Sequence, residues 1–251
     1  MKELKILYLY PDMLELYGDQ GNIQVLRYRL EQRGIHCTID TYSIGDKRPN
    51  FKSYDMIFAG GGADNEQGIL SKDLIQYKEE IQEAEKEGVF FLLICGAYQL
   101  FGKYYKNIHG HIIPGLEIFP YYTESSEKEK KRYIGDIILS VNLNGQETKI
   151  IGFENHSGQT YDIPSPFGKI LFRKAHQFSD TEEGFFKENV IATYLHGPLL
   201  SKNPKLADYI IKHCLDKKYQ EDTILKPLND TFENLCRKQL LHKFLNMNHD
   251  N

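Results

Sequence analysis

The sequence predicts an α/β fold with a mostly parallel central sheet flanked by helices. Three segments of strand length in the first half, at 4–10, 54–59 and 90–94, are apolar at nearly every position, which is typical of strands buried on both faces, and a fourth at 35–42 is more polar. Charged segments of helical length separate them, and this alternation favours parallel strands joined by helical crossovers. In the second half, shorter apolar segments lie between Gly, Asn and Pro turns, which predicts additional short strands.

In the first half the elements follow in a regular order. Pro11 and Asp12 end the first apolar run, and Gly34 ends the first amphipathic segment. The predicted strands cover residues 4–10, 35–42, 54–59 and 90–94, and the predicted helices cover residues 23–33, 70–87 and 98–105.

In the second half the pattern is less regular. The predicted strands cover residues 117–119, 135–141, 149–153, 169–172 and 190–195, with a polar loop at 123–131 and helices at 205–217 and 230–245. No composition break divides the chain. We therefore expect one domain over residues 1–251, with a core at about 4–213 and a C-terminal helical extension at 218–251.

Composition excludes several classes of function. The net charge of −4 gives no basic excess for a nucleic-acid partner, and no apolar run reaches the ~20 residues of a membrane-spanning helix. Four cysteines lie far apart without a CxxC pair, so we expect neither a metal site nor a disulfide framework, and a cytoplasmic location. Three of them, Cys37, Cys214 and Cys236, are expected to pack in the core.

The fourth cysteine, Cys95, stands at a distinctive position. The apolar run 88–94 ends at Cys95, and Gly96 and Ala97 then allow a tight turn into a helix. A strand, a sharp turn and a helix form a nucleophile elbow, in which the helix end stabilises a thiolate. The alternative is a buried structural cysteine at a strand end.

His196 is the candidate general base, and Gly60-Gly61-Gly62 is the candidate oxyanion hole. Both follow predicted strands, and the carboxyl ends of parallel strands share one edge of a sheet, so they can meet Cys95 there. Glycines allow backbone amides to approach a developing oxyanion, although the triplet could also be a flexible turn. Neither GxGxxG nor GxxxxGK[ST] occurs, so no phosphate-binding loop of these kinds is predicted.

These motifs together resemble the class I (triad-type) glutamine amidotransferases, in particular their cobyric acid synthase-like branch. The resemblance covers about residues 4–213 and implies the flavodoxin-like α/β fold of that class. Within the branch, three motifs are similar to the GatD-type glutaminase subunits of lipid II isoglutaminyl synthase: YPDMLELYGDQGN at 10–22, FENHSG at 153–158 and YLHGP at 194–198.

The resemblance implies a role for each matching residue. Cys95 would attack the side-chain amide of L-glutamine and form a γ-glutamyl thioester, and His196 would transfer the protons. The amides of Gly96 and of the glycine triplet, with Gly61 and Gly62, would bind the oxyanion. Ammonia would pass to a MurT-type, Mur-ligase-like partner in a heterodimer. That partner uses ATP and Mg²⁺ to amidate D-glutamate in lipid II, so this chain needs no cofactor.

Two further residues belong to the expected site, and two more lie at its border. The resemblance implies that Arg132 binds the substrate α-carboxylate, although Arg132 follows a charged run and could be merely solvated. Asn155 is placed in a loop after a strand, where it lines the pocket or stabilises a turn. Asp19 and Asn22 are expected to cap or shape the first helix at the border of the crevice.

Two departures from the family pattern bear on the mechanism. Leu93 and Ala97 stand where many class I domains have glycine, and Pro198 stands where the triad acid usually lies. The acid must therefore come from elsewhere, or Cys95 and His196 act as a dyad. We hypothesise that the partner subunit supplies a carboxylate in trans, which would keep the glutaminase activity low until assembly.

Three other functions remain open at this point. The chain could serve another synthetase, such as a corrinoid-amidating enzyme, but that relative normally carries a fused ATP-binding domain. It could be a non-catalytic α/β binding module, which the presence of both Cys95 and His196 disfavours. It could also be a DJ-1- or peptidase-like cysteine hydrolase, in which a histidine usually follows the cysteine, whereas Gly96 follows here.

Overall fold

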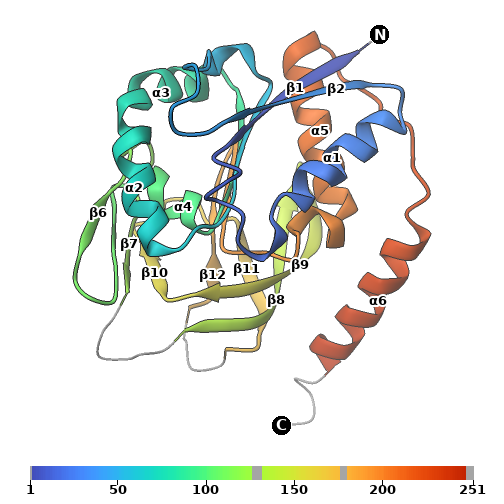
Figure 1. The fold of residues 1–251 in the computed structure, drawn as a ribbon. Coiled ribbons are helices and arrows are strands. Elements are labelled where there is room, and N and C mark those ends of the chain that lie inside the picture. The colour runs from blue at the N-terminus through green and yellow to red at the C-terminus, as the bar shows by residue number, and fades with distance from the viewer. Residues whose placement is uncertain (1, 126–131, 176–179, 247–251) are drawn as a thin grey trace.

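A six-stranded sheet runs through the centre of the computed structural model, which describes residues 2–125, 132–175 and 180–246 (Figure 1). The strand order is β13-β14-β4-β3-β1-β2. The strands are β1 (Glu3–Leu9), β2 (His36–Tyr42), β3 (Met56–Ala59), β4 (Phe90–Ile94), β13 (Phe185–Lys187) and β14 (Val190–Thr193). All neighbouring pairs are parallel except β13 with β14, so the predicted mostly parallel sheet is confirmed.

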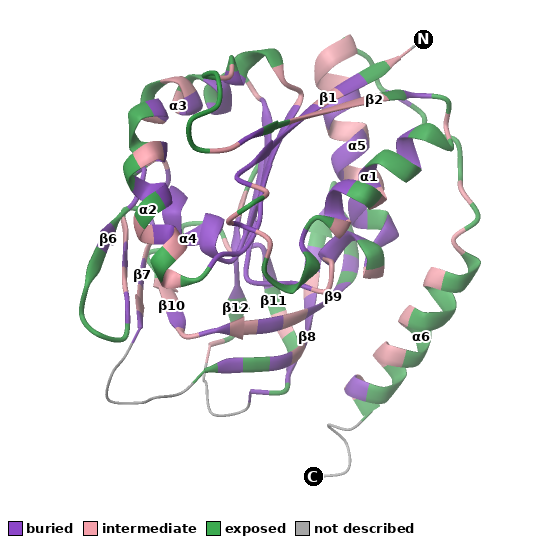
Figure 2. Cartoon of the chain, viewed as in Figure 1, coloured by how far each residue is buried: buried purple, intermediate pink, exposed green. Residues whose placement is uncertain are grey.

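Helices cover both faces of this sheet. α1 (Gly21–Glu31) and α5 (Pro204–Tyr219) lie on one side, and α2 (Asp64–Leu74) and α3 (Lys78–Lys86) lie on the other (Figure 1). Every residue of β3, β4 and β14 is consequently buried, as Figure 2 shows. This burial on two faces explains why these strands are apolar at every position.

The second half builds two antiparallel layers beside the central sheet. One has the order β10-β7-β5-β6, and the other has the order β12-β11-β8-β9. Their strands are β5 (Tyr104–Lys106), β6 (Ile112–Pro114), β7 (Tyr122–Ser125), β8 (Tyr133–Leu143), β9 (Gln146–His156), β10 (Gly158–Tyr161), β11 (Gly168–Arg173) and β12 (Glu182–Glu183). β8 and β9 join through Asn144-Gly145, both at positive φ, which is the two-residue hairpin turn that follows strand twist.

Several predicted boundaries were wrong. The helix expected over 98–105 is the shorter α4 (Gly96–Phe101), and the residues after it form β5. Residues 117–119 form no strand but an irregular connection, from which Phe119 is buried in the core. In the loop expected at 123–131, the first three residues belong to β7 and 126–131 lie outside the described residues. The helix at 70–87 is divided into α2 and α3 by the 3-10 turn Ile75–Tyr77.

An ion-pair cluster fixes α1 against α5. The Arg29 guanidinium, 4% exposed, lies 2.7 Å from an Asp208 oxygen and 2.7 Å from an Asp230 oxygen. Arg33 adds a second contact to Asp208 at 2.8 Å. Planar guanidinium groups suit such paired carboxylate contacts. The position of α1 determines where the loop in front of it lies, and that loop reaches the site described below.

The last helix, α6 (Thr231–Asn246), lies outermost beyond α1 and α5 (Figure 1). Phe244 packs on Phe172 at a ring distance of 5.1 Å, and Arg237 donates to the carbonyl oxygens of Lys202 and Lys149. Cys236 on this helix is exposed, so its predicted core position was wrong, whereas Cys214 is buried as expected.

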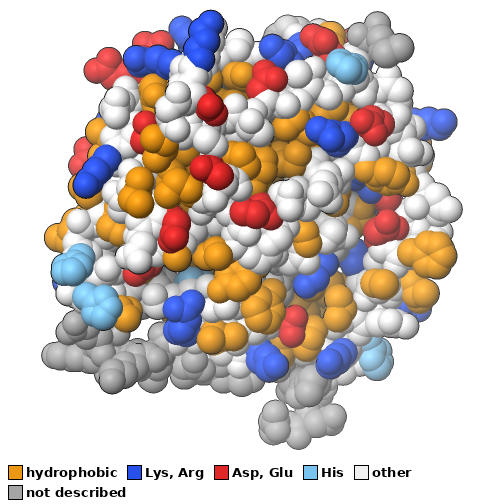
Figure 3. Space-filling model, viewed as in Figure 1, with side chains coloured by type: hydrophobic (Ala, Val, Ile, Leu, Met, Phe, Trp, Pro, Cys, Tyr) orange, Lys and Arg blue, Asp and Glu red, His pale blue; other side chains and the backbone are white. Residues whose placement is uncertain are grey.

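The molecular surface is mixed in charge. Acidic and basic side chains are interspersed on the face in Figure 3, in keeping with the small net charge of −4. Among the described residues, no helix combines the length and the hydrophobicity that crossing a membrane requires.

Candidate active site

Cys95 stands at a sharp corner between β4 and α4. Its φ of 52° and ψ of −101° are rare for a residue with a side chain, and such strain is found at functional corners. A Cβ on Gly96 would lie 2.8 Å from the Gly62 nitrogen, so only glycine fits after the cysteine. The strand, turn and helix of the predicted elbow are therefore present, without the glycines that many relatives have at positions 93 and 97.

His196 lies just beyond the end of β14, at the same edge of the sheet. β14 pairs with β4 in parallel, and the Cys95 amide donates to the Thr193 carbonyl at 2.8 Å. The His196 backbone exchanges two hydrogen bonds with Phe153, of 2.9 and 3.1 Å, so β9 fixes it from the other side. The parallel pairing thus brings the predicted base to the predicted nucleophile.

The acid beside His196 is Asp19. Its carboxylate oxygens lie 2.9 and 3.1 Å from His196 Nδ1, and both residues are almost fully buried. The Gly61 amide donates to the same carboxylate at 2.9 Å. Asp19 therefore orients the imidazole. Its side chain does not cap α1, so that part of the expectation was wrong, whereas its place at the border of the crevice is confirmed. The acid missing at position 198 is thus supplied by this chain, so Pro198 no longer supports a carboxylate from the partner subunit, which stays a prediction.

Pro198 and Gly21 explain how Asp19 reaches the histidine. A Cβ on Gly21 would lie 2.2 Å from Pro198 Cγ, so the start of α1 packs directly on the segment after His196. The Leu200 amide donates to Asn22 Oδ1 at 2.9 Å and ties the two segments together. Pro198, which excludes an acid two residues after the histidine, thus forms part of the contact that brings Asp19 there.

Gly61 lies where the three residues converge. A Cβ on Gly61 would be 3.0 Å from His196 Cε1, 3.3 Å from Asp19 Oδ2 and 3.3 Å from Cys95 Cβ. The absence of a side chain allows the imidazole, the carboxylate and the thiol to share this small volume. Residues from four separate elements therefore form one constellation around a single glycine.

The expected oxyanion hole changes in one respect. The Gly61 amide is already bonded to Asp19, so it is not available to a substrate oxygen. Among the described residues, the amides of Gly62 and Gly96 have no acceptor, and they lie side by side. Gln67 donates to the Gly62 carbonyl at 3.1 Å and orients that peptide. Gly62 and Gly96 remain the predicted pair of donors.

The electrostatics favour a charged imidazole. Burial by itself would lower the pKa of His196, whereas Asp19 and Cys95 raise it, and the resulting pKa is about 10. At neutral pH the ring then carries a proton on each nitrogen. Nε2 is buried without a hydrogen-bond partner among the described residues. A proton on Nε2 stabilises negative charge on the Cys95 sulfur, and such contacts commonly tighten only when substrate binds.

Arg132 and Asn155 form one contact near this edge of the sheet. Arg132 is exposed, and its Nη2 donates to Asn155 Oδ1 at 2.9 Å. Asn155 belongs to β9 and not to a loop, so that expectation was wrong. It lies two residues beyond Phe153, the partner of His196, which corresponds to ~7 Å along a strand.

The adjacent residue His156 points into the protein. Its ring stacks between Tyr133 and Tyr194, with centroid distances of 4.5 and 3.7 Å. Its Nδ1 lies 2.7 Å from the Gly158 carbonyl oxygen, and burial, the largest influence, lowers its pKa. His156 therefore supports the wall behind the site.

Sequence patterns gave little sign of Tyr17. Its ring lies edge-on to the His196 ring with a centroid distance of 4.8 Å, and 45% of the residue is exposed. Its φ of 61° is unusual for a tyrosine. Tyr17 thus covers the histidine from the solvent side, and only its position within the 10–22 motif pointed to it.

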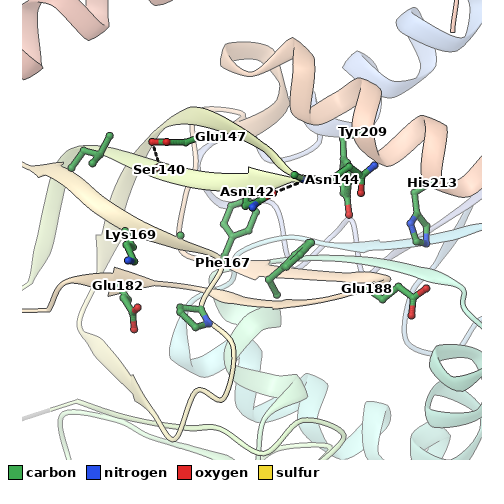
Figure 4. A pocket seen from close by; sticks show the side chains of 15 residues that line it. Ser140, Asn142, Asn144, Glu147, Phe167, Lys169, Glu182, Glu188, Tyr209 and His213 are labelled. Atoms are coloured by element: carbon green, nitrogen blue, oxygen red, sulfur yellow. Dashed lines mark hydrogen bonds between the residues drawn. The ribbon is translucent and has the colours of Figure 1, made fainter. Parts of the chain in front are cut away.

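A large cavity lies elsewhere. A space of about 950 Å³ opens between α5 and the second-half strands, where Tyr209 and His213 face Glu188 and Asn144 (Figure 4). Glu188 precedes β14, so this cavity is at the opposite end of the strand from His196. Among the described residues, no group of three or more His, Cys, Asp or Glu side chains is placed to hold a metal ion.

Comparison with known proteins agrees with this geometry. Residues 5–204 match the CobB/CobQ-like glutamine amidotransferase domain. The GatD subunit of lipid II isoglutaminyl synthase from Streptococcus pneumoniae is 38% identical over 91% of this chain and 86% of its own length. The same subunit from Staphylococcus aureus is 37% identical over 87% of each chain.

A third, more distant relative is also similar to this chain. The probable cobyric acid synthase of Methanocaldococcus jannaschii is 28% identical over 69% of this chain and 37% of its own length. The family match over residues 5–204 includes Cys95, His196, Asp19 and the glycine triplet. This chain belongs to the CobB/CobQ-like glutamine amidotransferase family.

Proposed function

We propose that this chain is the glutaminase subunit of a lipid II isoglutaminyl synthase. It hydrolyses L-glutamine and delivers ammonia to a ligase partner, which amidates D-glutamate to D-isoglutamine in the peptidoglycan stem peptide. The observation that carries this proposal is the meeting of Cys95, His196 and Asp19 around Gly61 in a chain 38% identical to a GatD subunit.

The chemistry proceeds in two halves. The Cys95 thiolate attacks the side-chain amide carbon of glutamine, and the oxyanion is bound by the Gly62 and Gly96 amides. The protonated His196 gives its Nε2 proton to the leaving nitrogen, which departs as ammonia and leaves a γ-glutamyl thioester. His196 then removes a proton from water, and the resulting hydroxide attacks the thioester carbon. The C–S bond breaks, glutamate is released and Cys95 is regenerated. Asp19 keeps Nδ1 protonated and the ring in place throughout.

Arg132 is the proposed contact for the substrate α-carboxylate. Its guanidinium is exposed and held by Asn155 on the strand that pairs with His196. A guanidinium offers two parallel donors to a carboxylate, which fixes orientation as well as charge. The exposed position suits a free amino acid that enters from solvent.

The partner is proposed to be a MurT-type, Mur-ligase-like subunit. It would use ATP and Mg²⁺ to activate the carboxyl group of D-glutamate, and this chain would contact lipid II only through that partner. The cysteines of this chain are unpaired, which suits a reducing cytoplasm and keeps Cys95 available as a thiol.

Co-expression with the candidate ligase subunit tests the proposal. Glutamate release and lipid II amidation are measured for wild type, Cys95→Ser, His196→Ala and the control Cys236→Ser, whose exposed thiol is outside the site. We expect both site variants to lose at least ~10³-fold in rate and the control to match wild type. Undiminished glutamate release by Cys95→Ser would contradict the mechanism. Glutaminase activity without lipid II amidation would point to a different acceptor.

A further inference from the structure

The segment that presents His196 is held by a buried carboxylate that the mechanism above does not use. Glu183, on β12, is 4% exposed. Its Oε2 accepts a hydrogen bond from Thr193 Oγ1 at 2.7 Å, and its Oε1 accepts one from the Tyr194 amide at 2.7 Å. Thr193 Oγ1 in turn accepts from the Leu195 amide at 3.2 Å. All three residues before His196 are thus tied to one side chain.

The same attachment reaches the nucleophile. The carbonyl of Thr193, whose hydroxyl binds Glu183, accepts the hydrogen bond from the Cys95 amide at 2.8 Å. Glu183 therefore fixes one peptide segment that contacts Cys95 on one side and continues into His196 on the other. A shift of that segment changes the distance between the thiol and the imidazole, and small misplacements of reacting groups reduce rates strongly.

The glycine after Glu183 allows β12 to lie close to β14. Gly184 has a φ of +73°, and a Cβ there would lie 2.8 Å from the Ala192 carbonyl oxygen. Any larger residue would push β12 away from β14. Among the described residues Glu183 forms no ion pair, and a buried carboxylate without a contacting cation opposes folding. A carboxylate at this position is therefore better explained by function than by stability.

We propose that Glu183 is a positioning residue for the glutamine hydrolysis proposed above. Its carboxylate, in the unprotonated form, holds the Thr193–Leu195 segment so that His196 faces Cys95. It touches neither substrate nor reacting atoms and acts through the backbone.

The protonation of Glu183 provides a readout. Burial, the largest influence, raises the pKa of Glu183 to about 7, although the hydrogen bonds from the Tyr194 amide and the Thr193 hydroxyl act to lower it. Of the charged neighbours, Glu154 on β9 acts to raise this pKa and Arg173 on β11 to lower it. A protonated carboxyl group carries its own O–H donor and has less acceptor capacity, so at least one of its two hydrogen bonds must weaken or reverse direction. The proposal therefore predicts that kcat falls as the pH drops below about 7.

Stability has the opposite dependence. Because the pKa of Glu183 is higher in the folded than in the unfolded chain, its favourable contribution exists at low pH and is lost as the pH rises through about 7. Removing the charge should then raise Tm at pH 8 and leave it nearly unchanged at pH 5. A residue with a purely structural role would lower Tm when replaced.

The test uses the co-expressed complex with Glu183→Gln, Thr193→Val and Thr193→Ser. Glu85→Gln is the matched control, since Glu85 is another buried carboxylate, at the opposite end of β4 and β14. We expect Glu183→Gln and Thr193→Val to lower kcat by ~10- to 100-fold with KM within twofold. Thr193→Ser should restore most of the rate, and the decline below pH 7 should be absent in Glu183→Gln. The proposal would be refuted if Glu183→Gln kept the kcat and the pH profile of the wild type. It would also be refuted if the loss in kcat came with a lower Tm, as a purely structural role predicts.

A second measurement separates this proposal from the function itself. The rate of Cys95 alkylation by iodoacetamide requires no glutamine, and peptide mass spectrometry separates it from alkylation of the exposed Cys236. Positioning by Glu183 predicts that Glu183→Gln slows alkylation in the same direction as His196→Ala, while Glu85→Gln does not. This result would stand even if the complex failed to hydrolyse glutamine. An unchanged alkylation rate in Glu183→Gln would argue against positioning.

Discussion

The two ends of the parallel strands β4 and β14 use space and charge differently. At the carboxyl end, Cys95, His196 and Asp19 are packed so tightly that Gly61 admits no side chain. At the amino end, a cavity of about 950 Å³ is open to solvent and lined by charges of both signs. There Glu85 is neutralised directly by Lys187 at 2.5 Å.

The difference supports the proposed location of the active site. Among the described residues, Cys95, His196 and Asp19 meet at the crowded end, whereas the large cavity is lined by none of the three. The crowded end also carries the strained backbone at Cys95 and the buried imidazole whose pKa is raised to about 10. Constrained polar groups, and not cavity size, identify the site.

The largest expected effect comes from removing the charge that orients His196. The Asp19 carboxylate accepts hydrogen bonds from both His196 Nδ1–H and the Gly61 amide. Asp19→Asn must place an NH₂ group, which is a donor, against one of these two donors. We expect kcat for glutamine hydrolysis to fall by ~10²–10⁴-fold, with KM nearly unchanged. Full activity of Asp19→Asn in the assembled complex would indicate that the partner supplies the orienting carboxylate.

Adding a methyl group at the crowded end tests the packing itself. Gly61→Ala places a Cβ 3.0 Å from His196 Cε1, so the ring must move away from Cys95. A loss of ~10- to 100-fold in kcat is expected from steady-state assays of glutamate release. Gly68→Ala is the control, because a Cβ there meets nothing within 4 Å and lies on α2. It should retain activity and gain ~0.5–1 kcal/mol of stability.

A smaller effect is expected at the rim of the site. Arg132→Ala should raise KM for glutamine by ~10-fold and change kcat less, because it removes binding and not chemistry. The KM of Arg132→Lys should lie between those of the wild type and Arg132→Ala, since lysine keeps the charge but lacks the paired donors. Arg48→Ala, an exposed arginine paired with Glu80 elsewhere, serves as the control. Equal KM values for all four proteins would exclude Arg132 from substrate binding.

The smallest effect is on thermal stability. The pKa of His196 is raised to about 10 in the folded chain, so the pairing with Asp19 stabilises the fold fully below the ordinary histidine pKa. That contribution is lost as the pH rises towards 10. We expect the Tm difference between wild type and Asp19→Asn to be ~5 °C at pH 6 and to shrink by pH 10, as measured by calorimetry. A constant difference would show that the pair is not ionised.

Local patterns determined much of this protein. Apolar runs specified the central strands β3, β4 and β14 because burial on two faces leaves no polar position, and the run ending at Cys95 specified the elbow. The same edge-of-sheet argument placed His196 beside that elbow before any contact was known. The boundaries after residue 100 failed because short strands in mixed layers depend on partners that no local pattern contains.

Only the tertiary structure decided which groups complete the site. Asp19 and His196 are 177 positions apart, and they meet because Gly21 packs on Pro198 and Asn22 binds the Leu200 amide. Pro198 by itself indicated only that the acid usually found two residues after the histidine is missing. In the structure, the packing of Gly21 on Pro198 is what allows Asp19 to reach His196. Periodicity and spacing describe how one segment folds, whereas the hydrogen bonds between two loops depend on how their segments pack together in space.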